Sequence, residues 1–143
     1  MPMTANNKAE IEDAQLALLA EHRIDLVVLA KYMQIVSEHF VRAYENQIIS
    51  IHQALPAFPG ARPYHSAHAR GVRIVGATAH YVTEVLDAGP IIEQDVMRIS
   101  HRDTVQDLVR SGRDIKKIVL ARAIWKHLQN KIIVHHGRTI VFH

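Results

Sequence analysis

The sequence contains no cysteine, which excludes a disulfide framework and thiolate chemistry. It also lacks a serine nucleophile elbow, and its six glycines have the wrong spacing for a dinucleotide or P-loop motif. No apolar run approaches the length of a membrane span, and the polar N-terminus has no apolar signal region. A cytoplasmic protein is therefore the expectation.

The charge is only mildly one-sided, at a formal +3 over 143 residues. An acidic partner would suit that sign, but lysine and arginine are scattered and no nucleic-acid-binding motif accompanies them. We therefore expect neither nucleic acid nor membrane as a partner. The length indicates one domain, and a hydrophobic content of 48% is ordinary for a globular protein.

Hydrophobic patterns and turn residues predict an α/β fold. An amphipathic helix is expected over residues 7–22, with Ile11, Ala14, Leu18 and Leu19 on one face. Ser37 is placed to cap a short helix, and Thr104 begins a capping box that opens a long helix ending near Gln129. Further expected elements are strands over residues 26–30, 48–51, 72–82 and 90–99, a short helix ending at Gly71, and a hairpin over residues 131–142 that turns at His136 and Gly137.

The strand over residues 26–30 is a continuous apolar run, which is typical of strands buried on both faces of a parallel sheet. Such a strand needs neighbours on both edges, yet only one helix precedes it. We therefore expect the chain to lack an N-terminal part of its domain. An exposed apolar edge associates readily, so a homo-oligomer is expected.

His52 and Asp87 are the strongest candidates for chemistry. His52 ends a buried strand, and Asp87 lies in a loop closed by Gly89 and Pro90. An α/β enzyme commonly places functional groups at such positions, and an acid beside a base can activate water. Alternatively, His52 is a hydrogen-bonded structural histidine and Asp87 a turn residue.

The eleven histidines also invite a metal site. His65 and His68 lie one helical turn apart, and His135 and His136 are adjacent. No cysteine is present, and no carboxylate joins either pair at a recognised spacing. The sequence therefore predicts no metal site.

Seven segments of the chain carry recognisable motifs: residues 7–10, 24–35, 60–65, 76–82, 86–95, 112–114 and 139–142. Together they resemble the C-terminal half of formyltetrahydrofolate deformylases, which are hydrolases of the formyltransferase superfamily. The glycinamide ribonucleotide transformylases share the fold and the His/Asp pair, but residues 61–65 and 90–95 look more like the deformylases.

The resemblance implies a partial Rossmann-like formyltransferase fold of class α/β. It would have a mostly parallel sheet, flanking helices, and a C-terminal helix plus hairpin. Residues 1–143 would be the C-terminal portion of the catalytic domain, without the regulatory ACT domain of the full-length members. The implied activity is hydrolysis of 10-formyltetrahydrofolate to formate and tetrahydrofolate, which supplies formate for purine synthesis in one-carbon metabolism. No metal or organic cofactor is implied, because the folate is the substrate.

By the same resemblance, Asp87 would activate the attacking water and His52 would stabilise the oxyanion. Ser50 stands where the family has an asparagine that donates to the oxyanion, and the segment after His52 is one residue shorter than in the family. These departures leave a non-catalytic folate-binding fragment as an alternative, and a glycinamide ribonucleotide formyltransferase is another. The pterin pocket would be formed by Tyr32, Met33, Gln34, Ile35, Val36, Val82, Thr83, Glu84 and Leu86, with His80 in support.

Overall fold

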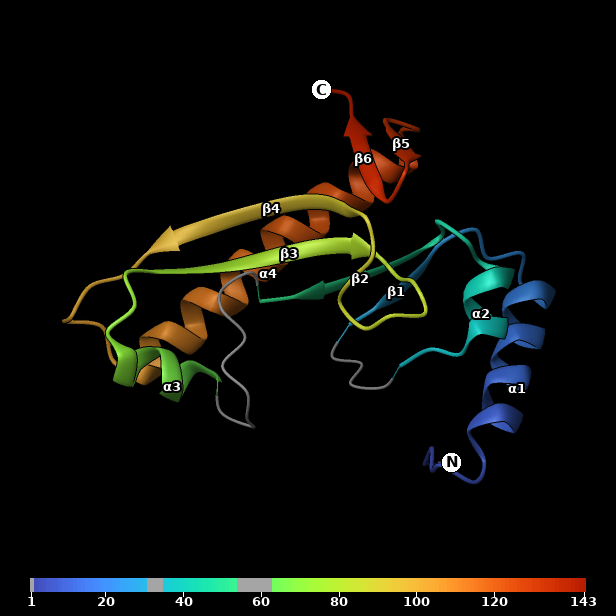
Figure 1. The fold of residues 1–143 in the computed structure, drawn as a ribbon, viewed down its shortest axis with the longest axis horizontal. Helices are drawn as coiled ribbons and strands as arrows, with labels where there is room; N and C mark the ends of the chain where they lie inside the picture. Colours follow the sequence, from blue (N-terminus) through green and yellow to red (C-terminus); the bar gives the residue numbers. More distant parts are fainter. Residues whose placement is uncertain (1, 31–34, 54–62) are drawn as a thin grey trace.

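The computed structural model describes residues 2–30, 35–53 and 63–143. This part of the chain forms a four-stranded sheet, a two-stranded hairpin and flanking helices (Figure 1). The α/β class expected from the sequence is confirmed. The elements in chain order are α1 (Lys8–Glu21), β1 (Val27–Leu29), α2 (Glu38–Ala43), β2 (Ile48–His52), α3 (Pro63–Arg70), β3 (Ile74–Tyr81), β4 (Ile91–Arg98), α4 (Val105–Leu128), β5 (Ile132–His135) and β6 (Arg138–Val141).

The strands of the main sheet follow chain order, β1-β2-β3-β4. β1 is parallel to β2, whereas β2 with β3 and β3 with β4 are antiparallel. The expectation of a mostly parallel sheet is therefore wrong for the described strands. The apolar composition of the strands gave no sign of direction, because a strand buried on both faces has the same pattern in either orientation.

The long helix α4 crosses one face of the sheet and forms the main core with β3 (Figure 1). Every residue of β3 after Ile74 is buried, so this strand is covered on both faces. The predicted capping box is present: Thr104 Oγ1 accepts from the Asp107 amide at 3.2 Å, and Asp107 Oδ2 accepts from the Thr104 amide at 2.8 Å. The buried residues of α4 recur at helical spacing: Leu108, Gly112, Ile115, Val119 and Ala123. Ile115, Val119 and Ala123 pack on the sheet, whereas Gly112 faces Tyr64 of α3.

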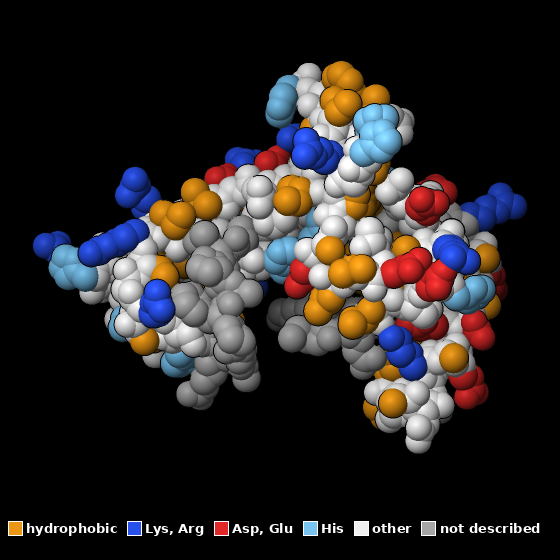
Figure 2. Space-filling model, in the orientation of Figure 1, with side chains coloured by type: hydrophobic (Ala, Val, Ile, Leu, Met, Phe, Trp, Pro, Cys, Tyr) orange, Lys and Arg blue, Asp and Glu red, His pale blue; other side chains and the backbone are white. Residues whose placement is uncertain are grey.

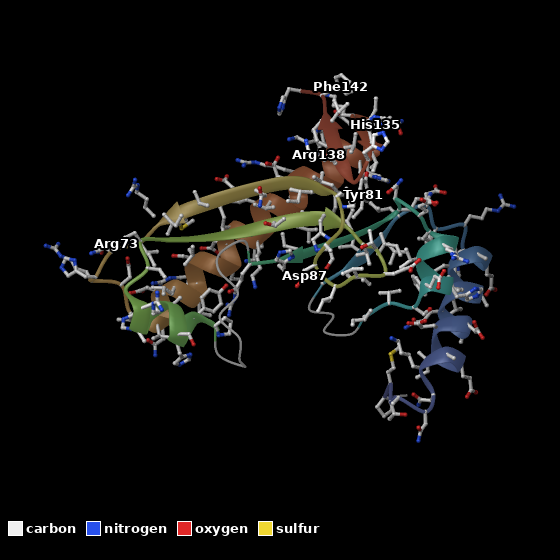
Figure 3. All side chains as sticks on the ribbon, in the orientation of Figure 1. Arg73, Tyr81, Asp87, His135, Arg138 and Phe142 are labelled. Atoms are coloured by element: carbon white, nitrogen blue, oxygen red, sulfur yellow. The ribbon has the colours of Figure 1, made fainter. Side chains whose placement is uncertain are left out.

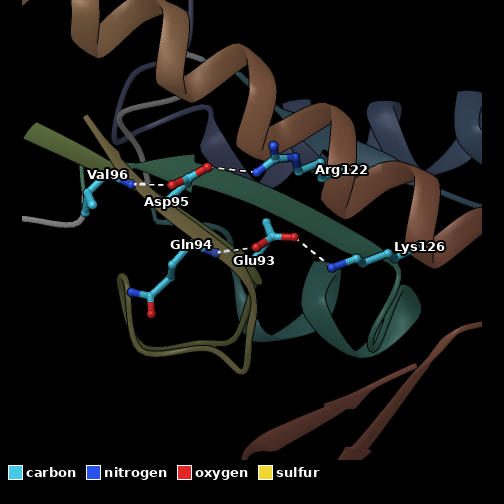
Figure 4. A network of polar contacts seen from close by, with 6 residues as sticks. All are labelled: Glu93, Gln94, Asp95, Val96, Arg122 and Lys126. Carbon is cyan, nitrogen blue, oxygen red and sulfur yellow. Dashed lines mark hydrogen bonds and ion pairs between the residues drawn. The ribbon is translucent and has the colours of Figure 1, made fainter. Parts of the chain in front are cut away.

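Two ion pairs join β4 to α4 across this interface (Figure 4). Glu93 Oε2 lies 2.7 Å from Lys126 Nζ, and Asp95 Oδ2 lies 2.8 Å from Arg122 Nη1. The backbone amide of Val96 and the guanidinium of Arg122 lower the pKa of Asp95. Since Glu93 and Asp95 point to the same side of β4, the helix is held along the strand at two successive positions.

The helix α1 is confirmed, but only part of its predicted apolar face is correct, since Leu19 packs inward whereas Ala14 and Leu18 do not. Ala14 is exposed and Leu18 is 55% exposed, whereas Glu12 is only 3% exposed. Leu16 and Leu19 pack with α2 and the β1–β2 end of the sheet. Glu12 belongs to that inner face because its carboxylate accepts from the Ser37 amide at 3.3 Å, a contact 25 residues away that no helical period reveals.

The remaining predicted elements are confirmed. Ser37 caps α2, accepting from the Phe40 amide at 3.2 Å. The C-terminal hairpin pairs β5 with β6 and turns at His136 and Gly137, both with positive φ. Among the helices that the structure describes, none is both long and apolar enough to cross a bilayer.

In the described sheet, β1 lies at the edge and pairs only with β2. Val27 and Leu29 pack toward α1 and α2, but Val28 on the other face is 37% exposed. The prediction that this strand is buried on both faces is therefore wrong. A short apolar edge strand with free backbone groups is a template for pairing with another chain.

We predict that this edge drives self-association, and that Val28→Lys weakens it, because an edge lysine opposes strand pairing. Light scattering should give a lower average mass for the variant than for the unaltered chain. Ile118→Lys is the matched control, since Ile118 is 42% exposed on α4, away from β1. A monodisperse monomer of the unaltered chain would contradict the prediction.

Candidate active site

The sheet face opposite α4 carries a row of polar side chains. Strand register places Ser50 opposite His80, and His52 opposite Thr78. Directly paired residues of antiparallel strands point to the same face, so all four share it. Gln94 extends the row, donating from Nε2 to Thr78 Oγ1 at 2.9 Å. Alternation along the strands therefore separates this polar row from the apolar residues that contact α4.

The loop between β3 and β4 brings Asp87 back to this row (Figure 3). Asp87 has φ of +54°, a left-handed conformation that few residues other than glycine adopt, although aspartate tolerates it better than most. Such backbone strain concentrates at functional sites. Because the aspartate adopts this conformation, the chain turns sharply where its carboxylate meets the sheet.

Gly89 fixes how closely the loop packs on β3. A Cβ at Gly89 would lie 1.6 Å from the Tyr81 carbonyl oxygen, which no side chain can do. The loop is tied to the sheet at both ends, with the Tyr81 amide donating to Pro90 at 2.9 Å and the Val82 amide to Ile48 at 2.8 Å. The position of Asp87 therefore depends on a glycine two residues later.

Asp87 meets two histidines. Its Oδ1 lies 3.4 Å from His52 Nδ1 and 3.7 Å from His80 Nε2. The two imidazole rings are 5.0 Å apart between centroids. The structure thus brings together the His52 and Asp87 pair singled out in the sequence and places His80, which was expected in support, as a second neighbour of the carboxylate.

The tautomer of His80 follows from its surroundings. Its Nδ1 lies 2.9 Å from the Tyr81 carbonyl oxygen, and a carbonyl can only accept, so Nδ1 carries a proton. The other ring nitrogen, Nε2, therefore faces Asp87 and has no hydrogen-bond partner among the described residues. Since the side chain is only 4% exposed, bulk water does not replace that partner freely.

The surroundings of His52 favour the neutral form of its imidazole ring. Burial lowers the pKa of His52 from its usual value of 6.5, and His80 lowers it further, while the Asp87 carboxylate opposes both. His52 Nδ1 is also buried without a hydrogen-bond partner in the described structure. A neutral imidazole can accept a proton at one nitrogen while donating from the other, which suits it to proton transfer or to an oxyanion.

Access to this group comes from the side of the loop. The Asp87 side chain is 50% exposed, whereas the two histidines lie deeper. Val85 and Leu86 beside it are 65% and 59% exposed. In the space-filling view, histidine and acidic side chains meet near the middle of the face, next to hydrophobic side chains (Figure 2). A substrate with an apolar ring beside its reacting group would match this arrangement.

The other predicted binding residues fall into two groups. Val36 is buried with Phe40 and Ile48, and Val82 packs on the same cluster, so both belong to the apolar core beside β1 and β2. The second group lies at or near the surface: Ile35, Thr83, Glu84 and Leu86, with Thr83 Oγ1 donating to the Val85 carbonyl at 3.2 Å. Tyr32, Met33 and Gln34 lie outside the described residues.

The contacts that α1 makes with residues 35–37 were not predicted from the sequence. Lys8 Nζ donates to the Ile35 carbonyl, and the buried Glu12 accepts from the Ser37 amide. Lys8 and Glu12 lie 4.0 Å apart, one turn apart on α1. The i,i+4 charge spacing was visible in the sequence, but it also fits an ordinary solvated helix face.

Comparisons with known proteins bear on the whole chain. The formyl transferase domain family matches residues 2–124. The formyltetrahydrofolate deformylase of Synechocystis sp. is 60% identical over 142 residues, covering 99% of this chain and 50% of that protein. The crystal structure of a formyltetrahydrofolate deformylase from Burkholderia mallei has a TM-score of 0.95 at 44% identity, covering 99% of this chain and 51% of the other.

A second kind of relative has the same fold. Glycinamide ribonucleotide transformylase 1 from Symbiobacterium toebii gives a TM-score of 0.84 at 32% identity, covering 95% of this chain and 65% of the other. The chain spans about half the length of the curated relatives that it matches.

We predict that Gly89→Ala destabilises the fold by about 1–3 kcal/mol, because the added methyl forces the loop away from the Tyr81 carbonyl. Urea unfolding should show the loss, and the NMR signals of the His80 ring should shift with the displaced carbonyl. The neighbouring Ala88→Ser, at an exposed position, is the matched control. An unchanged unfolding midpoint for Gly89→Ala would show that the close packing is dispensable.

Proposed function

This chain belongs to the formyl transferase family, and we propose that it carries the hydrolytic site for the formyl group of 10-formyltetrahydrofolate, releasing formate and tetrahydrofolate. The resemblance drawn from the sequence motifs is confirmed at the level of the family. The observation that carries the proposal is the convergence of His52, His80 and Asp87. Named deformylases among the relatives support the choice of reaction.

Asp87 is the proposed base for the attacking water. The carboxylate is half exposed, so substrate and water can reach it, and two imidazole rings flank one of its oxygens. The water oxygen forms a bond to the formyl carbon as its proton passes to Asp87. The C–N10 bond then breaks, and the proton moves to N10 of the departing tetrahydrofolate.

His52 is the proposed electrophilic partner. Its lowered pKa keeps the ring neutral, so a ring N–H can donate to the oxyanion that develops on the formyl oxygen. Ser50 lies two residues earlier on the same face of β2, which makes its hydroxyl a second donor. His80 supports the arrangement from the adjacent strand, held in one tautomer by the Tyr81 carbonyl.

The pterin ring is proposed to bind between the segment around Ile35 and the loop that carries Asp87. Leu86 offers an exposed apolar surface beside Asp87, and Ile35 is 49% exposed on the other segment. Backbone groups of residues 82–86 would hydrogen-bond the polar edge of the ring. The formate released would serve one-carbon metabolism and purine synthesis.

A second candidate reaction is transfer of the formyl group to an amine instead of water. The likeness to a glycinamide ribonucleotide transformylase favours it, because that protein shares the fold with a TM-score of 0.84. Consumption of 10-formyltetrahydrofolate that requires a ribonucleotide amine would identify a transferase. Consumption without any amine would identify a hydrolase.

The hydrolytic proposal predicts formate release from 10-formyltetrahydrofolate that falls about 10²–10⁴-fold in Asp87→Asn, since the amide cannot take the proton of water. The measurement is formate production by the purified chain. Asp95→Asn is the matched control, because Asp95 pairs with Arg122 on the opposite side of the sheet. Equal turnover in Asp87→Asn would refute the role of Asp87 as the base. No turnover in the unaltered chain would refute the proposal and leave a non-catalytic folate-binding fragment.

The proposed mechanism also predicts that replacing Ser50 with asparagine increases the rate of hydrolysis. Ser50→Asn should raise kcat by up to about 10²–10³-fold, because the longer amide side chain extends further toward the oxyanion than the serine hydroxyl. Ser50→Ala is the comparison and should lower kcat, because it removes the proposed second donor. A fall in kcat for Ser50→Asn, with folding intact by circular dichroism, would show that the site is built around the shorter side chain.

A further inference from the structure

The helix α1 carries a buried carboxylate that the proposed mechanism does not use. Glu12 is buried, whereas the acidic residues Glu10 and Asp13 beside it in the sequence are exposed. Moving a charged carboxylate out of water costs free energy unless opposite charge and hydrogen bonds compensate for the lost hydration. The contacts that compensate Glu12 therefore indicate why a charge is kept at this position.

Glu12 and Lys8 both reach from α1 to the main chain of one short segment. Glu12 Oε1 accepts from the Ser37 amide at 3.3 Å and lies 4.0 Å from Lys8 Nζ. Lys8 Nζ in turn donates to the Ile35 carbonyl. A solvated i,i+4 pair would contact only its own helix. This pair instead joins α1 to residues 35–37.

Three consecutive residues of this segment are each fixed by a different interaction. The carbonyl of Ile35 is held by Lys8, the side chain of Val36 is buried in the core between α1, α2 and β2, and the amide of Ser37 is held by Glu12. Ser37 also caps α2, which lies beside α1 (Figure 1). The half-exposed side chain of Ile35 thus projects from a backbone that is held on both sides of Val36.

We propose that Lys8 and Glu12 are positioning residues for folate binding, because they hold the backbone that presents Ile35 to the pterin ring. The inference rests on the proposed function, in which the pterin lies beside Ile35. Hydrogen bonds from charged groups are stronger than those between neutral groups, so the pair holds the segment more firmly than water would. The motif at residues 7–10 thereby gains a role through Lys8.

Four variants separate positioning from a general contribution to the fold. Lys8→Met and Glu12→Met remove the charged groups but keep unbranched side chains that suit a helix. Glu10→Met is the matched control, since it removes the same charge from an exposed position of α1. Lys8→Arg keeps a cationic donor for the Ile35 carbonyl. The Lys8 side chain is 31% exposed, so Lys8→Met tests the proposal even where Glu12→Met does not fold.

The first measurement is an anaerobic calorimetric titration of the full chain with tetrahydrofolate. Lys8→Met and Glu12→Met should each raise Kd about 10-fold, as expected when one hydrogen bond to a charged group is lost. Glu10→Met and Lys8→Arg should bind as the unaltered chain does. With 10-formyltetrahydrofolate, KM should rise by the same factor while kcat stays unchanged, because neither side chain is placed at the reacting atoms.

Amide hydrogen exchange of the chain without folate supplies a second readout. The Ser37 amide should exchange about 10-fold faster in Glu12→Met, because its acceptor is gone, and should be unchanged in Glu10→Met. Both variants are compared at equal distance from their urea unfolding midpoints, so that a general loss of stability is excluded.

The outcomes distinguish this inference from the hydrolytic proposal. Weaker tetrahydrofolate binding in both methionine variants of a chain that releases no formate would support positioning while hydrolysis fails. Unchanged Kd in both variants would overturn positioning, whether or not formate is released. A fall in kcat with KM unchanged would overturn it too, as would the absence of tetrahydrofolate binding by the unaltered chain.

Discussion

The backbone carbonyl of Tyr81 is the point on which the arrangement of the site depends. It accepts the Nδ1 proton of His80, and it leaves space for no residue except glycine at position 89. One oxygen atom therefore sets both the tautomer of a buried histidine and the approach of the loop that carries Asp87. The site is assembled from local contacts around the end of β3, where the sheet also carries a register shift between Ala79 and His80.

The other side of β3 supplies the rigidity that this arrangement needs. α4 packs on Ala77, Ala79 and Tyr81, and the Tyr81 hydroxyl meets His127 Nδ1 of that helix at 2.7 Å. Burial raises the pKa of Tyr81 to about 12 and lowers the pKa of His127, so a protonated hydroxyl faces a neutral ring. A strand fixed on one face by a 24-residue helix can present polar groups on the other with little movement.

The convergence of His52, His80 and Asp87 leaves polar atoms without hydrogen-bond partners. His52 Nδ1 and His80 Nε2 are buried and have no such partner among the described residues, and burying a polar group without a partner costs free energy. The two nitrogens lie 3.4 and 3.7 Å from Asp87 Oδ1. A water or a polar ligand group at hydrogen-bond distance would supply the missing contacts.

The sequence by itself determined the identities of the elements, the helix caps at Ser37 and Thr104, and the hairpin turn, and it singled out His52 and Asp87 as candidates. These depend on local rules of periodicity, capping and turn chemistry. Only the tertiary structure decided the antiparallel pairing of β2 with β3, the inward face of α1 at Glu12, and the approach of His80 to Asp87. Those features depend on contacts between residues distant in the chain, or on the path of a loop. Local sequence patterns do not specify such contacts, because the side chains meet only after the strands have paired in register.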